Sequence, residues 1–330
     1  MKEKKQFINL LRVLAAICIT NSHLANVWPI SAIASGGMLG DVLFLAISGY
    51  CLYNSEFRLR DFGKWYIKRI RRIYITVTVI TLLTCFFTEF PSSVSGWIKT
   101  FIYPTQYHFV ASIMILYIVY YIWMYFLKRW RVRVWISGTT FLTVTLIIYA
   151  LTFDKSWYHI DVVEDQFIRF LFFTAMLMGA YFRESEKEVG NPSVKNVGAV
   201  SILCVGLVML YFAVRIVVPK FELFTVQFLT WIAILIALYG IFYWAETLEP
   251  YLLQLPVKAN RCLAFLAGIT LQIYLVQFPI IERFEIFIFP LNLLVIMVVI
   301  IVAATIVYWI DYFVQKIIDV IVYHNHCDGK

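Results

Sequence analysis

The sequence predicts an all-α integral membrane protein, a polytopic bundle of about ten transmembrane helices. Apolar residues make up 62% of the 330 residues and charged residues only 15%, a composition outside the range of soluble domains. Apolar segments long enough to cross about 30 Å of hydrocarbon recur along the chain. Because their connections are short, residues 1–330 are expected to form a single transmembrane domain. Ten spans are predicted, at residues 7–27, 37–55, 70–90, 108–127, 133–153, 166–182, 196–217, 224–245, 263–283 and 291–318.

Basic residues are distributed unevenly between the two sides of this arrangement. If the N-terminus is cytoplasmic, the inside segments hold 21 of the 28 Lys and Arg residues. The outside loops then hold four, which are Lys99, Lys155, Lys220 and Arg283. The positive-inside rule therefore predicts that both termini are cytoplasmic. The net charge of +8 then reflects topology and attraction to anionic membrane lipid, and no nucleic-acid partner is expected.

The first span carries a cation and a titratable base. Arg12 and His23 are eleven positions apart, almost three helical turns, so both side chains are predicted to project from one helix face. An Arg within a span costs ~2.5–3.5 kcal/mol on insertion scales, so such residues usually mark a pathway or a reaction site. The basic start and the small residues at 32–34 are also typical of a signal peptide, but the apolar region is too long for one.

The second span contains small residues and the motif Ser48-Gly49-Tyr50. Gly36 and Gly40 would let two helices approach closely. The motif places the Ser48 hydroxyl and the Tyr50 phenol near the cytoplasmic end of the span, with a gap at Gly49, which has no side chain. Because this span runs antiparallel to the first, Asp41 is expected near His23, where its carboxylate would orient the imidazole. An interfacial Asp41 that faces water is the alternative.

Basic residues are concentrated at the start of the third span, in the segment RLRDFGKWYIKRIRRIYI. The four that lie closest together are Lys68, Arg69, Arg71 and Arg72. Arg presents planar donors to phosphate oxygens, so the cluster suits a polyphosphate cofactor that arrives from the cytoplasm. The alternative is that these residues are only the positive charges that flank the cytoplasmic end of a span. No Walker or glycine-rich phosphate loop is present, which argues against ATP as an energy source.

The later spans carry isolated polar residues. His108 begins the fourth span, either as an interfacial anchor or as a second imidazole of the His23 site. Gln272, Gln277 and Asp311 are expected to point inward to protein partners. The terminal stretch 324–327 has metal-ligand residue types, but its spacing matches no standard site, and the six cysteines show no paired spacing. Neither a metal nor a disulfide framework is expected.

Taken in order, these motifs resemble the membrane acyltransferase-3 family, integral membrane enzymes that acylate bacterial surface polysaccharides and related acceptors. The matching motifs are the R-x10-H of Arg12 and His23, the run Phe44–Tyr50 that ends in SGY, the R-x-x-R of Arg69 and Arg72, the pair His108-Phe109, and the late stretch Tyr274–Pro279. The chain departs from the family at three positions. It has Gln277 where many relatives have His, Ile75 where many have Pro, and Asp41 displaced by one residue.

The resemblance implies an acyl-CoA donor, usually acetyl-CoA, which binds as a substrate, so no permanently bound cofactor is expected. It implies an acceptor hydroxyl, most often on a cell-surface polysaccharide or glycolipid, and a location in the bacterial cytoplasmic (inner) membrane. The donor phosphates would contact the basic cluster of the third span, with Tyr50 beside them. Membrane lipids are the remaining expected partners, and assembly into a homo-oligomer is left open.

The mechanism that this resemblance implies centres on His23. The imidazole would act as general base on the acceptor hydroxyl, and a covalent acyl-histidine relay is the alternative. Arg12 would bind the cofactor or steady the oxyanion, with Ser48 or Tyr50 assisting and Asp41 orienting the imidazole. A secondary transporter or flippase of a lipid or glycan intermediate is a competing function, but it predicts paired half-repeats, which are not seen. A glycan polymerase would need an outer loop larger than the longest one here, residues 91–107.

Overall fold

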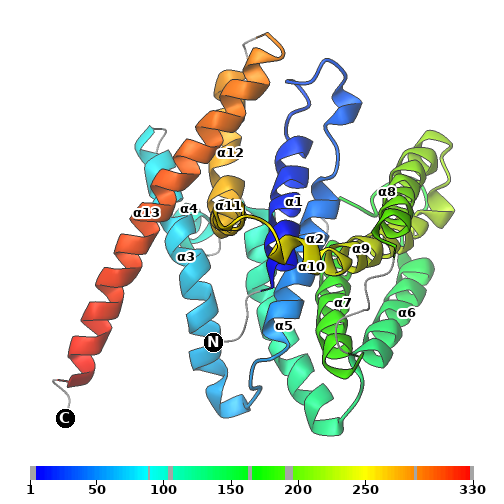
Figure 1. Cartoon of the computed structure of the whole chain (residues 1–330), viewed down its shortest axis with the longest axis horizontal. Helices are drawn as coiled ribbons and strands as arrows, with labels where there is room; N and C mark the ends of the chain where they lie inside the picture. The colour runs from blue at the N-terminus through cyan, green and yellow to red at the C-terminus, as the bar shows by residue number, and fades with distance from the viewer. Residues whose placement is uncertain are drawn as a thin grey trace. The chain divides into compact units, whose positions relative to one another are not determined.

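A computed structural model describes residues 5–87, 90–102, 107–162, 166–189, 196–285 and 288–327 (Figure 1). These ranges contain helices and no strand, so the all-α prediction is confirmed. The helices, with short 3-10 or π segments marked η, are α1 (Gln6–Ser22), η1 (Ser31–Ile33), α2 (Gly37–Leu52), η2 (Leu59–Asp61), α3 (Phe62–Phe87), α4 (Val94–Trp97), η3 (Ile98–Ile102), α5 (His108–Trp130), α6 (Val134–Thr152), α7 (Ile168–Val189), α8 (Val197–Lys220), η4 (Phe224–Val226), α9 (Leu229–Thr247), α10 (Glu249–Leu253), α11 (Val257–Gly268), α12 (Thr270–Phe284) and α13 (Leu291–Cys327).

Six helices in the described ranges are long and apolar enough to cross a membrane, and α11 with α12 would make a seventh if the two are taken together. The six are Ser31–Leu52, His108–Trp130, Val134–Thr152, Val197–Lys220, Leu229–Thr247 and Leu291–Val320. Helix α1 is apolar but shorter, with 17 residues. The chain is therefore a multi-pass membrane protein, whereas the number of ten spans and the orientation of the termini stay predictions.

The span predicted at 263–283 is not one continuous helix. Helix α11 ends at Gly268 and α12 begins at Thr270. Between them Ile269 has φ −99° and ψ 8°, which lies in the sparsely allowed bridge region rather than in the helical one. The break directly follows Gly268, a residue type that often ends a helix, but the apolar residues on both sides of it predicted one continuous span.

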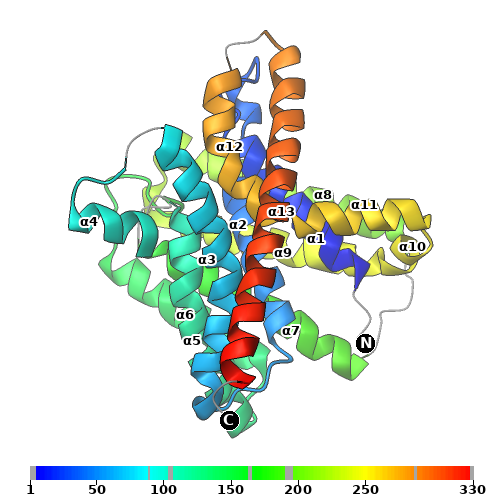
Figure 2. The ribbon, with the colours of Figure 1, turned by 90° about the vertical axis from the view of Figure 1, so that its left-hand side faces the viewer.

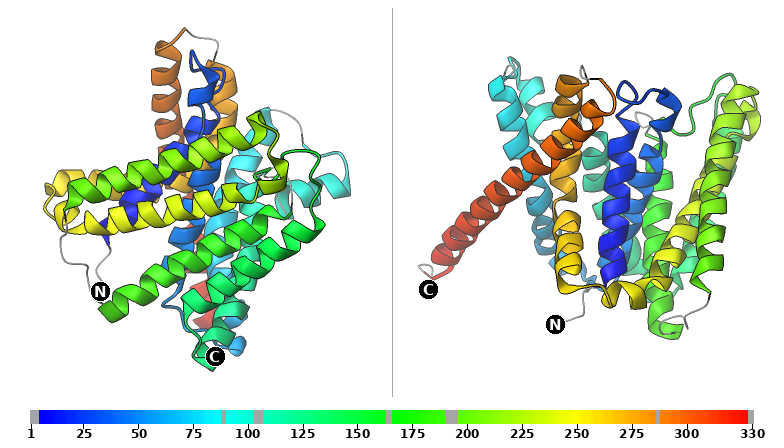
Figure 3. Two further views of the ribbon diagram at one scale, coloured as in Figure 1. Left: turned by 90° about the vertical axis from the view of Figure 1, so that its right-hand side faces the viewer. Right: turned by 45° about the horizontal axis from the view of Figure 1, so that its top comes forward.

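The chain divides into two compact units. The first unit contains Met1–Cys18, Gly37–Phe62 and Ile115–Ala267, and the second contains Ile19–Gly36, Gly63–Met114 and Gly268–Lys330. In the first unit α6 packs on α7, and α8 runs beside α9 (Figure 3, left). In the second unit α12 and α13 lie side by side (Figure 2).

Helices α2 and α7 of the first unit touch through their backbones at two glycines. A Cβ atom on Gly49 would lie 1.9 Å from the carbonyl oxygen of Met176, and one on Gly179 would lie 1.8 Å from that of Ala46. Only glycine permits such an approach. Close approach was predicted at Gly36 and Gly40, but Gly36 precedes α2 in a left-handed conformation with φ 104°.

A buried polar group joins three helices of the second unit. The Asp311 Oδ2 atom accepts hydrogen bonds from Thr76 Oγ1 at 2.7 Å and from Gln272 Nε2 at 2.9 Å. Asp311 and Gln272 are buried, as is Gln277. The prediction that these polar residues of the late spans point inward is therefore confirmed.

Candidate functional site

The first predicted site residue, His23, lies directly after α1. The helix ends at Ser22, because the N–H groups of His23 and Leu24 bond to carbonyl groups three residues back rather than four, at 3.1 Å each. Helix α1 is therefore shorter than the predicted span 7–27, and His23 is carried by a turn instead of a helix face. Its side chain is exposed and can be reached by a ligand.

Aromatic side chains flank His23. Its imidazole meets the Phe278 ring edge to face, with 4.5 Å between the ring centroids. Phe278 in turn contacts Tyr274 at 6.1 Å, and Tyr274 contacts Phe109 at 5.7 Å. These contacts belong to the second unit and hold one side of the imidazole against an apolar wall.

A hydrogen bond ties the last turn of α1 to the late motif. Thr20 Oγ1 donates to Gln277 Oε1 at 2.8 Å, across 257 positions of the sequence. Gln277 precedes Phe278, the residue that contacts the imidazole of His23. The structure thus brings the histidine of the first motif and the late motif together within the second unit.

Arg12 and Ser48 lie in the first unit on α1 and α2. The half-buried Arg12 guanidinium donates through Nη2 to the sulfur of Cys51 at 3.8 Å. Sulfur is a weak acceptor, so this contact leaves the cation able to bind an anion. Ser48 Oγ donates to the carbonyl oxygen of Phe44, one turn back in its own helix, at 3.0 Å. Cys51, three residues after Ser48, was not among the predicted site residues.

Asp41 is buried in α2, with 8% of its surface exposed. The predicted orienting role of Asp41 toward His23 stays a prediction.

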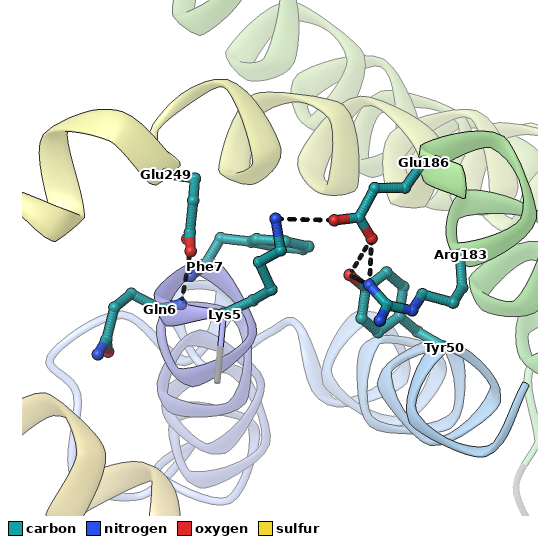
Figure 4. Close-up of polar contacts among 7 residues, drawn as sticks. All are labelled: Lys5, Gln6, Phe7, Tyr50, Arg183, Glu186 and Glu249. Atoms are coloured by element: carbon teal, nitrogen blue, oxygen red, sulfur yellow. Dashed lines mark hydrogen bonds and ion pairs between the residues drawn. The ribbon is translucent and has the colours of Figure 1, made fainter. Parts of the chain in front are cut away.

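Tyr50 belongs to a charged network at the ends of α1, α2 and α7 (Figure 4). Its hydroxyl donates to Glu186 Oε2 at 2.6 Å and accepts from Arg183 Nη1 at 2.9 Å. Arg183 also contacts Glu186, and Lys5 Nζ lies 2.8 Å from Glu186 Oε1. The Tyr50 hydroxyl is thus held by protein groups. Sequence reasoning missed Arg183 and Glu186, although the charged run RESEKE after an apolar segment marks them.

A second carboxylate fixes the start of α1. Glu249 accepts from the backbone N–H of Gln6 at 3.0 Å and from that of Phe7 at 2.6 Å (Figure 4). The first N–H groups of a helix have no partner within it, and a negative charge there is favoured by the helix dipole. Glu249 therefore positions the helix that carries Arg12.

The network around Glu186 predicts a pH-dependent contribution to stability. Burial favours a higher pKa for Glu186, but hydrogen bonds from Lys5 and Tyr50 and the Arg183 charge together hold this pKa below its ordinary value of 4.5. A lowered pKa stabilises the folded state above the unfolded pKa, and this stabilisation is lost as the pH falls through the folded pKa. Glu186→Gln should reduce the free energy of unfolding by about 1–3 kcal/mol at pH 7.

Thermal unfolding of the detergent-solubilised protein at pH 7 and at a series of values below 4.5 checks this expectation. The difference between wild type and Glu186→Gln should shrink only in the acidic part of the series. Glu56→Gln is the matched control, because Glu56 is exposed and pairs only with the exposed Arg58 in the described structure. A wild-type advantage that is the same at every pH contradicts the role of the Glu186 charge.

The predicted basic cluster occupies the first half of α3. The Arg69 guanidinium stacks over the Trp65 ring at 4.6 Å, and its Nη1 atom donates to the Trp65 carbonyl at 3.4 Å. Lys68 and Arg72 are exposed. Because they are four residues apart, they share one face of the helix.

The fourth member of this cluster has a partner. Arg71 Nη2 lies 2.6 Å from Asp319 Oδ1 of α13, within the second unit. Arg71 also borders an open apolar groove of about 230 Å³ along α3. The groove is lined by Tyr66, Ile67, Ile70, Arg71, Tyr74 and Ile75.

No group of three or more His, Cys, Asp or Glu side chains able to hold a metal occurs in the described part of the chain. The side chains of His324, His326 and Cys327, whose types suggested ligands, lie outside the described residues. His108 is exposed at the start of α5.

Comparison with known proteins gives one match. A family model described as an acyltransferase domain matches residues 5–312. No curated protein and no solved structure matches the chain. The matched range contains every sequence motif discussed above except the terminal stretch 324–327.

Proposed function

This chain belongs to the acyltransferase family whose domain covers residues 5–312, and from that premise we propose that it transfers an acyl group from cytoplasmic acyl-CoA to a hydroxyl of a cell-surface polysaccharide or glycolipid. The extent of the family match is the observation that carries the proposal. Acetyl is the expected acyl group, and the bacterial cytoplasmic membrane is the expected location.

The basic face of α3 is the proposed donor site. Lys68 and Arg72 are exposed on one side of the helix, and Arg69 is held over Trp65 with its guanidinium preoriented. Guanidinium groups bind phosphate oxygens through two parallel hydrogen bonds, which suits the phosphates of CoA. Arg71 contributes less in this proposal, because its charge is already neutralised by Asp319.

His23 is the proposed general base. Its imidazole is exposed and rests against Phe278, so one ring nitrogen can accept the proton of an acceptor hydroxyl. The hydroxyl oxygen then bonds to the thioester carbon. The C–S bond breaks, and the CoA thiolate takes the proton from the imidazolium. The half-buried cation of Arg12, whose described partner is a weakly accepting sulfur, is available for an anionic group of the donor.

Purified protein in lipid nanodiscs provides the direct test. Radiolabelled acetyl-CoA is supplied with and without a surface polysaccharide or lipid-linked oligosaccharide, and both thiol release and label transfer are followed. Acceptor-dependent transfer with release of free CoA supports the proposal. If no acyl-CoA is bound, hydrolysed or used, while proteoliposomes move a lipid-linked glycan across the bilayer, the flippase alternative replaces it.

The proposed donor site leads to a separate prediction about the affinity for CoA. Arg69→Ala and Arg72→Ala should each raise the Kd for CoA about tenfold or more with little change in kcat, because each removes charge-assisted hydrogen bonds worth ~1.5–3 kcal/mol. Arg69→Lys should also weaken binding, since the charge is kept but the planar fork is lost.

Calorimetric titration of CoA into the nanodisc-embedded variants measures this. Arg129→Ala is the matched control, because Arg129 is also an exposed arginine in a predicted cytoplasmic segment but bonds to Tyr125. Equal CoA affinity for wild type, Arg69→Ala and Arg72→Ala would leave the basic segment as a topological signal only.

A further inference from the structure

The amide of Gln277 keeps an unused hydrogen-bond donor. The side chain has no exposed surface, and its Oε1 atom accepts from Thr20 at 2.8 Å. Its Nε2 atom has no hydrogen-bond partner among the residues that the structure describes. A buried donor left unpaired costs about 1–3 kcal/mol, so such groups are rare and usually have a reason.

A second buried glutamine on the same helix provides a comparison. Gln272 lies five residues earlier on α12, and its Nε2 atom donates to Asp311 at 2.9 Å. Its donor therefore stabilises the contact of α12 with α13. Of these two buried amides, Gln277 is the one whose N–H donor has no partner among the described residues.

Two contacts link Gln277 to His23. The carbonyl group of Thr20 accepts the N–H of His23 at 3.1 Å, while its hydroxyl donates to Gln277. The following residue on α12, Phe278, contacts the imidazole at 4.5 Å between centroids. The Thr20 hydroxyl also fixes the amide, because it engages Oε1 and leaves Nε2 as the free end.

We propose that Gln277 Nε2 stabilises the oxyanion that forms from the thioester carbonyl when an acyl group is transferred at His23. This inference rests on the proposed function. As the acceptor oxygen bonds to the carbonyl carbon and its proton passes to His23, the carbonyl oxygen becomes negative and accepts the Nε2–H bond. Collapse of this intermediate expels the CoA thiolate, which is protonated by the imidazolium. Nothing is oxidised or reduced.

The absence of a partner for this N–H group before the reaction explains why such a donor accelerates it. An N–H group that is unpaired before the reaction and paired in the transition state binds the transition state selectively, which is the condition for catalysis. Because Nε2 has no exposed surface in the free protein, the thioester carbonyl reaches it only after a covering side chain moves aside.

Variants of Gln277 separate catalysis from folding. Gln277→Met keeps the volume but removes the donor, and kcat should fall about 10²–10³-fold, the usual effect of losing one oxyanion donor. The Kd for CoA should not change. Gln277→His restores an N–H donor and should recover most of kcat. Thr20→Val, which releases the amide from its fixed orientation, should lower kcat by about tenfold with CoA affinity unchanged.

Gln272→Met is the matched control, measured per folded molecule after size-exclusion chromatography. It should lower thermal stability by breaking the Asp311 contact but leave kcat unchanged. A kcat for Gln277→Met within threefold of wild type overturns the inference while acyl transfer by the wild type stands. Parallel loss of kcat and CoA affinity without rescue by Gln277→His also overturns it. A wild type that transfers no acyl group at all is a failure of the proposed function, and it is recognised before any variant is made.

Discussion

Replacing His23 with alanine should abolish acyl transfer while the protein still inserts and accumulates in the membrane. A general base typically contributes ~10²–10⁴-fold to the rate. The exposed imidazole stands after the end of α1 and makes an edge contact with Phe278, so its loss should cost little stability. Transfer of label from acetyl-CoA, normalised to the amount of monodisperse protein, is the measurement.

His108→Ala is the matched control for this variant. His108 is also exposed and lies at the start of α5, and its loss should leave most of the activity. Retention of more than about a tenth of wild-type transfer by His23→Ala would show that His23 is not the base. A burst of CoA release in the absence of acceptor, present in wild type and missing in His23→Ala, would assign the acyl-histidine relay instead of direct transfer.

Adding one methyl group at Gly49 or Gly179 should prevent normal assembly of α2 and α7. The new Cβ would lie 1.9 Å from the Met176 carbonyl oxygen or 1.8 Å from that of Ala46, so the two backbones would have to separate. Overpacking in a core costs ~1–3 kcal/mol and occasionally more, and here backbone rather than a flexible side chain must move. Gly49→Ala and Gly179→Ala are therefore expected at or above the upper end of this range.

Fluorescence-detected size exclusion and thermal melting of the tagged protein check this result. Gly63→Ala and Gly206→Ala are matched controls, because a Cβ at either position would lie more than 4 Å from every heavy atom beyond its chain neighbours and its own helix backbone. Since Ala has the higher helix propensity by ~1 kcal/mol, the controls should be as stable as wild type or more stable. Melting curves for Gly49→Ala and Gly179→Ala that match those of the controls would contradict the backbone contact.

The apolar segments of the sequence predicted most of the helices. Where each helix begins and ends depends on a few residues at its ends. The span predicted at 133–153 corresponds to α6, Val134–Thr152, and the span at 37–55 begins where α2 begins, at Gly37. The break at Ile269 was missed although Gly268 precedes it, because the apolar residues on both sides predicted one continuous span. The early end of α1 was missed because Leu24, Ala25 and Val27 continue the apolar pattern, whereas the N–H groups of His23 and Leu24 already bond to carbonyl groups three residues back.

The candidate site was predicted in its residue types but not in its partners. The sequence indicated that Gly49 marks a gap and that Tyr50 supplies a phenol. It did not indicate that the backbone of Met176 in α7 lies against Gly49, or that the Tyr50 phenol bonds to Glu186, 136 positions away. The spacing of a motif indicates which chemical groups lie near one another on the same helix. The group that it meets across the bundle depends on helix packing, which a single sequence does not encode in any short-range pattern.

The backbone contact between α2 and α7 also determines how the Ser48-Gly49-Tyr50 motif moves. Where two main chains touch, neither lipid nor a mobile side chain lies between them. The backbone hydrogen bonds of this turn of α2 therefore cannot break unless α7 also moves away. Local fluctuations are suppressed most strongly where contact density is highest. Ser48 and Tyr50 therefore flank a closely packed part of α2, where a rigid backbone supports their side chains. A stiff support would hold the side chains of these two predicted site residues within the fraction of an ångström that group transfer tolerates.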